Sequence, residues 1–234
     1  TVVCLSDNTI WGWGANESGQ LSNQPLLTGA LDGVRKFSSE CHGRGITAGA
    51  SFTAWIEQNS GYVRTIGAND ARQLGDSGYT AATSATPRYV KDSLGQMFSA
   101  EFIDAGEKWV VAIASGGTIW GWGDNSAGQL GVDPTSTPFS AVPLQIHTPA
   151  NDEEYPVFVK AGRQHGLAIL RNGSVIGWGQ NANQQLDPAG AILYPPIQVS
   201  GLTSMVRFLT DVVGIAAGEY HSLALQRSGV VYAW

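Results

Sequence analysis

Short apolar runs separated by turn residues recur along the whole chain. Residues 167–170 and 174–178 are two such runs, and Arg171-Asn172-Gly173 separates them. An Asn-Gly pair supplies the positive φ angles that a tight hairpin turn needs. The same pattern predicts five β-hairpins, at residues 3–14, 53–67, 110–123, 167–179 and 223–234.

Each predicted hairpin is part of a larger repeating unit. The residues that close the hairpins, Trp13, Ile66, Trp122, Trp178 and Trp234, are spaced by 53 residues and then three times by 56 residues. An Asn-x-x-x-Gln-Leu turn follows the first four hairpins, and an Ala-Gly pair precedes the last four. An apolar run before the hairpin and a Pro-containing edge segment after it bring each unit to four short strands. Four-stranded units repeated at this interval predict the blades of a β-propeller, with the tryptophans packed between neighbouring blades.

Two stretches of the chain resemble a known repeat. Residues 217–234 read Ala-Gly-Glu-x-His-Ser-Leu-Ala-Leu and end in Val-Tyr-Ala-Trp, and residues 122–131 read Trp-Gly-x-Asn-x-x-Gly-Gln-Leu-Gly. Together they resemble the regulator-of-chromosome-condensation type repeat, over the whole chain. The resemblance implies an all-β propeller that normally closes as a seven-bladed ring. Residues 1–234 are then expected to be one segment of about four to five blades from a longer chain.

The repeats are not identical. Ile66 replaces the Trp of the second unit, and Arg72 and Gln184 stand where two other units have a turn glycine. The linkers that follow the turns also differ in length and sequence. Variable loops on a constant frame are where such folds usually carry their function.

Composition and charge narrow the function classes. Thirteen Lys and Arg against nineteen Asp and Glu give a net charge of −6, and no basic stripe with interleaved aromatic residues is present, so nucleic acid is not an expected partner. No apolar run is long enough for a membrane-spanning helix. Only 14% of residues are charged, which favours an extracellular, cell-surface or virion setting over the cytoplasm or nucleus. Cys4 and Cys41 are interpreted as two small buried side chains, with a disulfide left open.

No catalytic or cofactor site is predicted. Gly75-Asp76-Ser77-Gly78 resembles a serine-peptidase loop, but no fitting His accompanies it. His165 and His221 occupy equivalent positions at which two other repeats have Phe52 and Trp109, and this pattern favours a structural role. No three metal ligands converge, so neither a metal nor another cofactor is expected.

The sequence therefore predicts a non-catalytic binding module rather than an enzyme. A rigid propeller would bind a protein or glycan through the turns 107–109, 163–165 and 219–221, together with the linkers 131–156 and 187–200. The remaining blades of the chain or another copy would complete it. The candidate binding residues are Glu107, Lys108, Trp109, Arg163, Gln164, His165, Glu219, Tyr220 and His221. The alternative, implied by the resemblance, is a guanine-nucleotide exchange factor or another intracellular regulator of a small GTPase.

Overall fold

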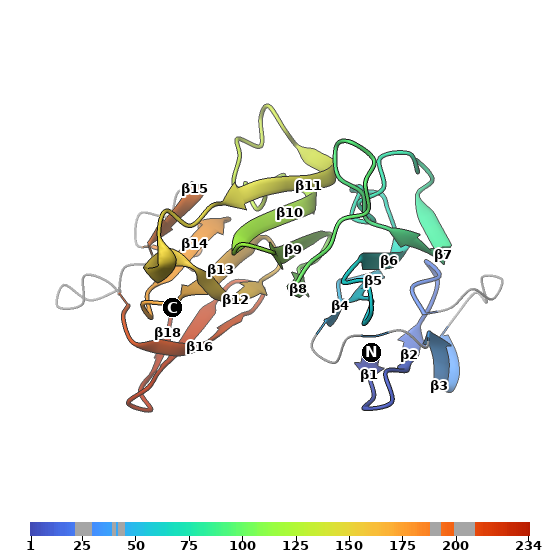
Figure 1. Cartoon of the computed structure of the whole chain (residues 1–234), viewed down its shortest axis with the longest axis horizontal. Coiled ribbons are helices and arrows are strands. Elements are labelled where there is room, and N and C mark those ends of the chain that lie inside the picture. Colours follow the sequence, from blue (N-terminus) through green and yellow to red (C-terminus); the bar gives the residue numbers. More distant parts are fainter. Residues whose placement is uncertain (22–29, 39–40, 42–44, 188–192, 199–208) are drawn as a thin grey trace.

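The computed structural model of the chain is an arc of small antiparallel β-sheets (Figure 1). It describes residues 1–21, 30–38, 41, 45–187, 193–198 and 209–234. The described residues form five sheets, three of four strands and two of three strands. The predicted all-β class is confirmed, because these residues contain no α-helix and a single short 3-10 helix, η1 (Asp152–Glu154).

Each sheet is built from strands that are consecutive in the chain. The first contains β1 (Val2–Cys4), β2 (Ile10–Ala15) and β3 (Ala30–Ser38), and the second contains β4 (Ile46–Ala48), β5 (Phe52–Ile56), β6 (Val63–Ala68) and β7 (Thr83–Tyr89). The third contains β8 (Phe102–Ala105), β9 (Trp109–Ala114), β10 (Thr118–Asp124) and β11 (Phe139–His147). The fourth contains β12 (Pro156–Ala161), β13 (His165–Leu170), β14 (Val175–Gly179) and β15 (Leu193–Gln198), and the fifth β16 (Val212–Ala217), β17 (Ser222–Gln226) and β18 (Val231–Ala233).

The sheets are arranged as the blades of a propeller. In the second, third and fourth blades the strands follow one another in sequence order from the inner to the outer edge of the arc (Figure 1). The innermost strands β4, β8, β12 and β16 lie side by side, each beside the next. The Ala-Gly pairs lie at the ends of these inner strands, so the fold brings four equivalent turns together.

The apolar core is divided among the interfaces between blades. One buried cluster joins the second and third blades through Phe52, Leu74, Val110 and Trp122, and two similar clusters join the third to the fourth and the fourth to the fifth blade. A smaller cluster joins the first two blades. Each of these clusters of described residues draws on two neighbouring blades, so each blade depends on its neighbours for the burial of its apolar face.

The repeated tryptophans connect one blade to the previous one. Trp122 and Trp178 are completely buried, and their indole Nε1–H groups donate to the main-chain oxygens of Gln73 and Gln129, at 3.1 and 2.8 Å. The prediction that these tryptophans pack between blades is confirmed for both. Trp234 also packs against the cluster between the fourth and fifth blades, whereas Trp13, whose sheet has no preceding blade among the described residues, is 37% exposed.

In two other blades a hydroxyl group, instead of an indole, donates to the equivalent Gln main-chain oxygen. The Thr53 hydroxyl donates to the Gln20 oxygen at 2.9 Å, and the Ser222 hydroxyl donates to the Gln185 oxygen at 2.7 Å. The repeat position of Thr53 and Ser222 holds Val110 and Gly166 in the blades that use a tryptophan. Ile66 can therefore replace the Trp of its repeat, because the hydroxyl of the same blade supplies the donor.

The Asn-to-Gln-Leu turns are also the same in each blade. The Asn side-chain oxygen accepts the main-chain N–H of the Leu five residues later, so this Asn caps the turn through its own side chain. The four pairs are Asn16 with Leu21 at 2.8 Å, Asn69 with Leu74 at 3.2 Å, Asn125 with Leu130 at 2.7 Å and Asn181 with Leu186 at 2.8 Å. Arg72 and Gln184 adopt φ angles of 65° and 61°, close to the 74° of Gly128, so the turn keeps its left-handed residue without a glycine.

The two ways of satisfying the Gln carbonyl can be exchanged. Trp178→Ile should lower the free energy of unfolding by about 3 kcal/mol, because it opens a cavity and leaves the Gln129 oxygen without its donor. Gly166→Thr alone should also destabilise, since a Cβ at Gly166 would lie 2.4 Å from the Trp178 ring. The double variant reproduces the Thr53 and Ile66 pair and should recover at least about 1 kcal/mol relative to the sum of the two losses. Urea unfolding measures all three variants, and strictly additive losses would contradict the exchange.

Candidate functional site

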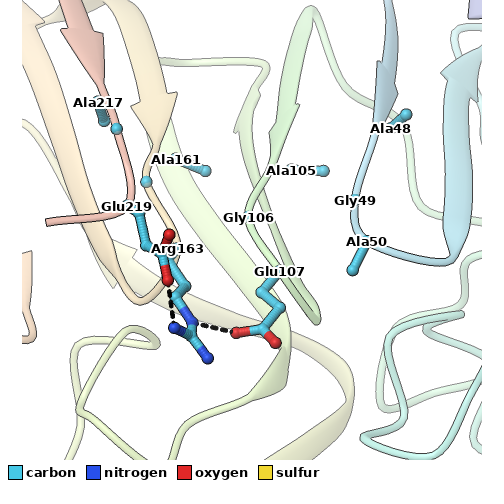
Figure 2. A pocket seen from close by; sticks show the side chains of 12 residues that line it. Ala48, Gly49, Ala50, Ala105, Gly106, Glu107, Ala161, Arg163, Ala217 and Glu219 are labelled. Carbon is cyan, nitrogen blue, oxygen red and sulfur yellow. Dashed lines mark hydrogen bonds and ion pairs between the residues drawn. The ribbon is translucent and has the colours of Figure 1, made fainter. Parts of the chain in front are cut away.

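The ends of the inner strands surround a hollow of about 490 Å³. Four equivalent triplets line it: residues 48–50, 105–107, 161–163 and 217–219 (Figure 2). Each triplet begins with Ala and Gly, so small residues form most of the wall. The third residue varies, and it is Ala50, Glu107, Arg163 and Glu219 in successive blades.

The glycine of each triplet is required by a ring three residues later. A Cβ at Gly106 would lie 2.0 Å from Trp109 Nε1, and a Cβ at Gly162 would lie 2.3 Å from His165 Cε1. Gly49 and Gly218 meet Phe52 and His221 at 2.0 and 2.2 Å in the same way. None of these four glycines has a positive φ angle, so space rather than backbone conformation excludes a side chain.

Main-chain hydrogen bonds link the turns of neighbouring blades. The Ala50 N–H donates to the Glu107 oxygen at 3.0 Å, the Glu107 N–H to the Arg163 oxygen at 3.2 Å, and the Arg163 N–H to the Gly218 oxygen at 3.2 Å. These bonds hold the third residues of the triplets at corresponding positions around the hollow. Their side chains are therefore neighbours although they are far apart in the sequence.

A row of alternating charges results. Arg163 lies between the carboxylates of Glu107 and Glu219 (Figure 2). Its Nε donates to Glu107 Oε2 at 2.5 Å, and its Nη1 donates to Glu219 and to the Tyr220 hydroxyl. Glu107 and then Glu219 raise the pKa of the guanidinium, and the bonds from Tyr220 and Arg163 lower the pKa of Glu219. Exposed ion pairs contribute only about 0–1 kcal/mol each to stability, so the main effect of this row is to position its side chains.

The residue that follows the triplet contacts the previous blade in two of the turns. Lys108 Nζ lies 2.5 Å from Asp70 Oδ2, and Gln164 Nε2 donates to Ser126 Oγ at 3.2 Å. Sequence reasoning missed Asp70 and Ser126, although both directly follow the repeated Asn and so share one position of the repeat. Tyr220 has Ala182 at that position instead. Its side chain remains 44% exposed and turns to Arg163.

The structure divides the nine candidate residues into two groups. Glu107, Lys108, Arg163, Gln164, Glu219, Tyr220 and His221 are exposed or half-buried around the hollow. Trp109 and His165 are completely buried, so their side chains face the core and a partner could not reach them. The Trp109 indole donates to the main-chain oxygens of Gly162 and Arg163 at 3.3 and 3.1 Å, and it thereby positions the next turn.

His165 has one accessible tautomer in this environment. Its Nε2 lies 3.1 Å from Ser222 Oγ, and the single hydroxyl hydrogen of Ser222 is already donated to Gln185. Nε2 must therefore carry the ring hydrogen, and Nδ1, which has no hydrogen-bond partner among the described residues, is unprotonated. Burial, and then the nearby His221, lowers the pKa of His165 to about 4.

Within the described part of the chain, no group of three His, Cys, Asp or Glu side chains could hold a metal ion. Asp76 of the Gly-Asp-Ser-Gly segment is buried and paired with Arg88 and Lys91, at 2.6 and 3.1 Å, so it serves the fold. No helix among the described residues has the length and apolar character needed to cross a membrane.

Comparisons with known proteins identify the same repeat. Models of the regulator of chromosome condensation (RCC1) repeat match residues 116–169 and 157–185. The chain is 26% identical to human E3 ubiquitin-protein ligase HERC2, over 96% of this chain and 4% of that protein. It is 27% identical to the ultraviolet-B receptor UVR8 of Arabidopsis thaliana, over the whole of this chain and 50% of that protein. The chain thus spans half or less of the length of these curated relatives.

Solved structures show the fold. Human WBSCR16 superposes with a TM-score of 0.77 at 18% identity, over 96% of this chain and 56% of that one. Yeast RCC1 (Prp20), in its complex with Kap60, superposes with a TM-score of 0.69 at 17% identity, over 100% and 67%. The predicted RCC1-like propeller is confirmed by these matches.

The buried imidazole predicts a loss of stability in acid. The pKa of His165 is lower in the folded chain than the ordinary 6.5, so the unfolded chain binds more protons between about pH 6.5 and 4. The free energy of unfolding should fall by up to about 3 kcal/mol as the pH drops through this window. His165→Phe, which copies Phe52, should remove this contribution, whereas His221→Phe, at an exposed ring, should keep most of it. Urea unfolding at a series of pH values tests this, and equal slopes for wild type and His165→Phe would contradict it.

Proposed function

We propose that this chain, an arc of RCC1-like repeats, is a non-catalytic module that binds a protein partner. Its contact surface would be the turn face, defined as Glu107, Lys108, Arg163, Gln164, Glu219, Tyr220 and His221. The observation that carries the proposal is the arrangement of Arg163 between Glu107 and Glu219, beside Tyr220 and above a hollow lined by Ala and Gly.

The physical properties of the turn face suit recognition. Tyr and Arg are the residue types that most often dominate binding energy at protein interfaces. Arg163 and Tyr220 are fixed by each other and by the two carboxylates, and the turns below them are joined by main-chain bonds. Side chains that are already ordered lose less conformational entropy when a partner binds. A fixed row with opposite charges also favours one orientation of a charged partner over others.

The comparisons support a protein as the partner. One of the solved structures similar in fold is yeast RCC1 (Prp20) bound to Kap60, and another concerns the binding of Prp20p to Gsp1p and histones. HERC2 is an E3 ubiquitin-protein ligase, and this chain matches 4% of it. The same comparisons lend no support to a glycan partner or to an extracellular or virion setting, and both stay predictions.

Guanine-nucleotide exchange on a small GTPase remains the alternative function. It differs from simple binding in a measurable way, because an exchange factor accelerates the release of labelled nucleotide from its GTPase. Acceleration that requires the turn face would assign this activity to the module, whereas complex formation without acceleration supports the binding function alone.

Site-specific crosslinking tests the turn face. A photo-crosslinking phenylalanine analogue at Tyr220 should give discrete protein adducts in extracts of the cells that produce the chain. The same group at Val157, which is exposed at the opposite end of β12, is the matched control and should give at least several-fold less adduct.

Arg163→Ala, introduced into the chain that carries the crosslinker at position 220, should remove most of the adduct. It should change the free energy of unfolding by less than about 1 kcal/mol, because the ion pairs are exposed. Arg227→Ala removes another exposed pair, with Asp211, and should leave the adduct unchanged. Equal labelling from positions 220 and 157, or no effect of Arg163→Ala, would contradict the proposed surface.

A further inference from the structure

The fold brings the two cysteines of the chain together. Cys4 lies on β1 and pairs with Ile10 on β2, and the turn between these strands contains Asn8. The main-chain N–H of Cys41 donates to the Asn8 oxygen at 3.0 Å. The backbone at Cys41 is thus attached to the hairpin that carries Cys4, although 36 residues separate the two cysteines in the sequence.

The two side chains share one small core. Cys41 is completely buried with Ile10, Trp55 and Ile66, and Cys4 packs against this cluster. Burial and a hydrogen bond with the Cys4 side chain raise the pKa of the Cys41 thiol. Cys4 is half-buried, so it is the more accessible of the two cysteines. Both are thiols in this structure.

We propose that Cys4 and Cys41 are an intramolecular dithiol site that forms a disulfide when a low-molecular-weight disulfide is present. The site is distinct from the turn face and does not rest on the proposed function. It lies between the first and second blades, at the interface where Ile66 replaces the tryptophan of the repeat.

The reaction needs a disulfide such as oxidised glutathione. The Cys4 thiol loses its proton, and its sulfur attacks one sulfur of glutathione disulfide, which releases one glutathione thiolate and leaves a mixed disulfide on Cys4. Cys41 then loses its proton and attacks the Cys4 sulfur, which releases the second glutathione. Two protein thiols are oxidised to one disulfide, and one glutathione disulfide is reduced to two thiols.

The order of the two steps follows from the environment. Only thiolates attack disulfides, and the raised pKa of Cys41 keeps its thiol protonated. Cys4 is therefore the attacking residue and Cys41 the resolving one. The second step should be slow but intramolecular, because the two side chains are already packed in one cluster.

The bond would strengthen an interface of unusual composition. At the next two interfaces a tryptophan fills the space and donates to a carbonyl, whereas here the smaller Thr53 hydroxyl donates to the Gln20 oxygen. A disulfide across this loop restricts the unfolded chain, and bonds of this loop length typically stabilise by a few kcal/mol. The melting temperature of the oxidised chain should rise by roughly 5–10 °C.

Mass spectrometry of the full chain tests the site. The chain is incubated with oxidised glutathione, the remaining thiols are trapped with N-ethylmaleimide, and the intact mass is measured with and without prior reduction. The expected product is two hydrogen atoms lighter than the reduced chain and carries no N-ethylmaleimide and no glutathione. Two N-ethylmaleimide groups, a persistent mixed disulfide, or a dimer linked through Cys4 would each overturn the proposal.

Single variants assign the two roles. Cys41→Ala should stop the reaction at the glutathione adduct of Cys4, and Cys4→Ala should leave Cys41 unmodified in the folded chain because it is buried. A rise in melting temperature on oxidation that persists in Cys41→Ala would contradict stabilisation by the disulfide. Circular dichroism of both reduced variants verifies that each is folded.

Discussion

A buried main-chain carbonyl at each Gln of the repeated turn constrains how the blades join. A buried acceptor without a donor costs about 1–3 kcal/mol, so each blade has to offer a hydrogen to the blade before it. Two donors meet this requirement, the indole of Trp122 or Trp178 and the hydroxyl of Thr53 or Ser222. The clash is local to the fourth blade, where a Cβ at Gly166 would overlap the Trp178 ring, whereas the third blade combines Val110 with Trp122. The equivalent Gln oxygen therefore keeps a donor at all four interfaces while the residues that supply it change.

A second constraint, between the Ala-Gly pairs and the rings that follow them, creates the candidate site. The rings at positions 52, 109, 165 and 221 leave no space for a side chain on the preceding glycines. The inner wall of the arc is consequently lined by the smallest residues, and a hollow remains. The third residue of each triplet is free of this packing requirement. It is also the residue that varies in charge from blade to blade, and this separation of scaffold from variable positions is typical of folds that carry function on loops.

The interfaces between blades are built alike but are not equivalent. The interfaces closed by Trp122 and Trp178 each combine a large indole with a buried carbonyl. At the first interface Cys4, Cys41, Trp55 and Ile66 fill the space instead, and at the last one His165 and Ser222 form a buried polar pair. These substitutions make the stability of single interfaces depend on solution conditions. The interface at His165 responds to acid, and the interface at the cysteines responds to oxidants, while the repeated fold stays the same.

The strands, the hairpins and the blades were determined by the sequence alone, because they follow from local patterns repeated at one interval. Apolar runs, Asn-Gly turns and the Asn-to-Leu spacing act within a few residues, so no knowledge of distant neighbours is needed. The candidate turns were also recognisable, since they occupy one position of the repeat. Only the tertiary structure decided which of their residues are accessible. Trp109 and His165 belong to the same turns as Tyr220, yet they are buried, because a following blade covers them and forms hydrogen bonds with both.

The pairings across blades were likewise invisible in the sequence. Asp70 and Lys108 are 38 residues apart, Arg163 and Glu219 are 56 apart, and Cys4 and Cys41 are 37 apart. None of these separations carries a local signal, because an ion pair or a thiol contact depends on how one blade is rotated against the next. Trp13 shows the same limit, since it has the sequence context of Trp122 but the exposure of an outer sheet. Local periodicity determines the blades, and the packing of one blade on another determines the surface that they present.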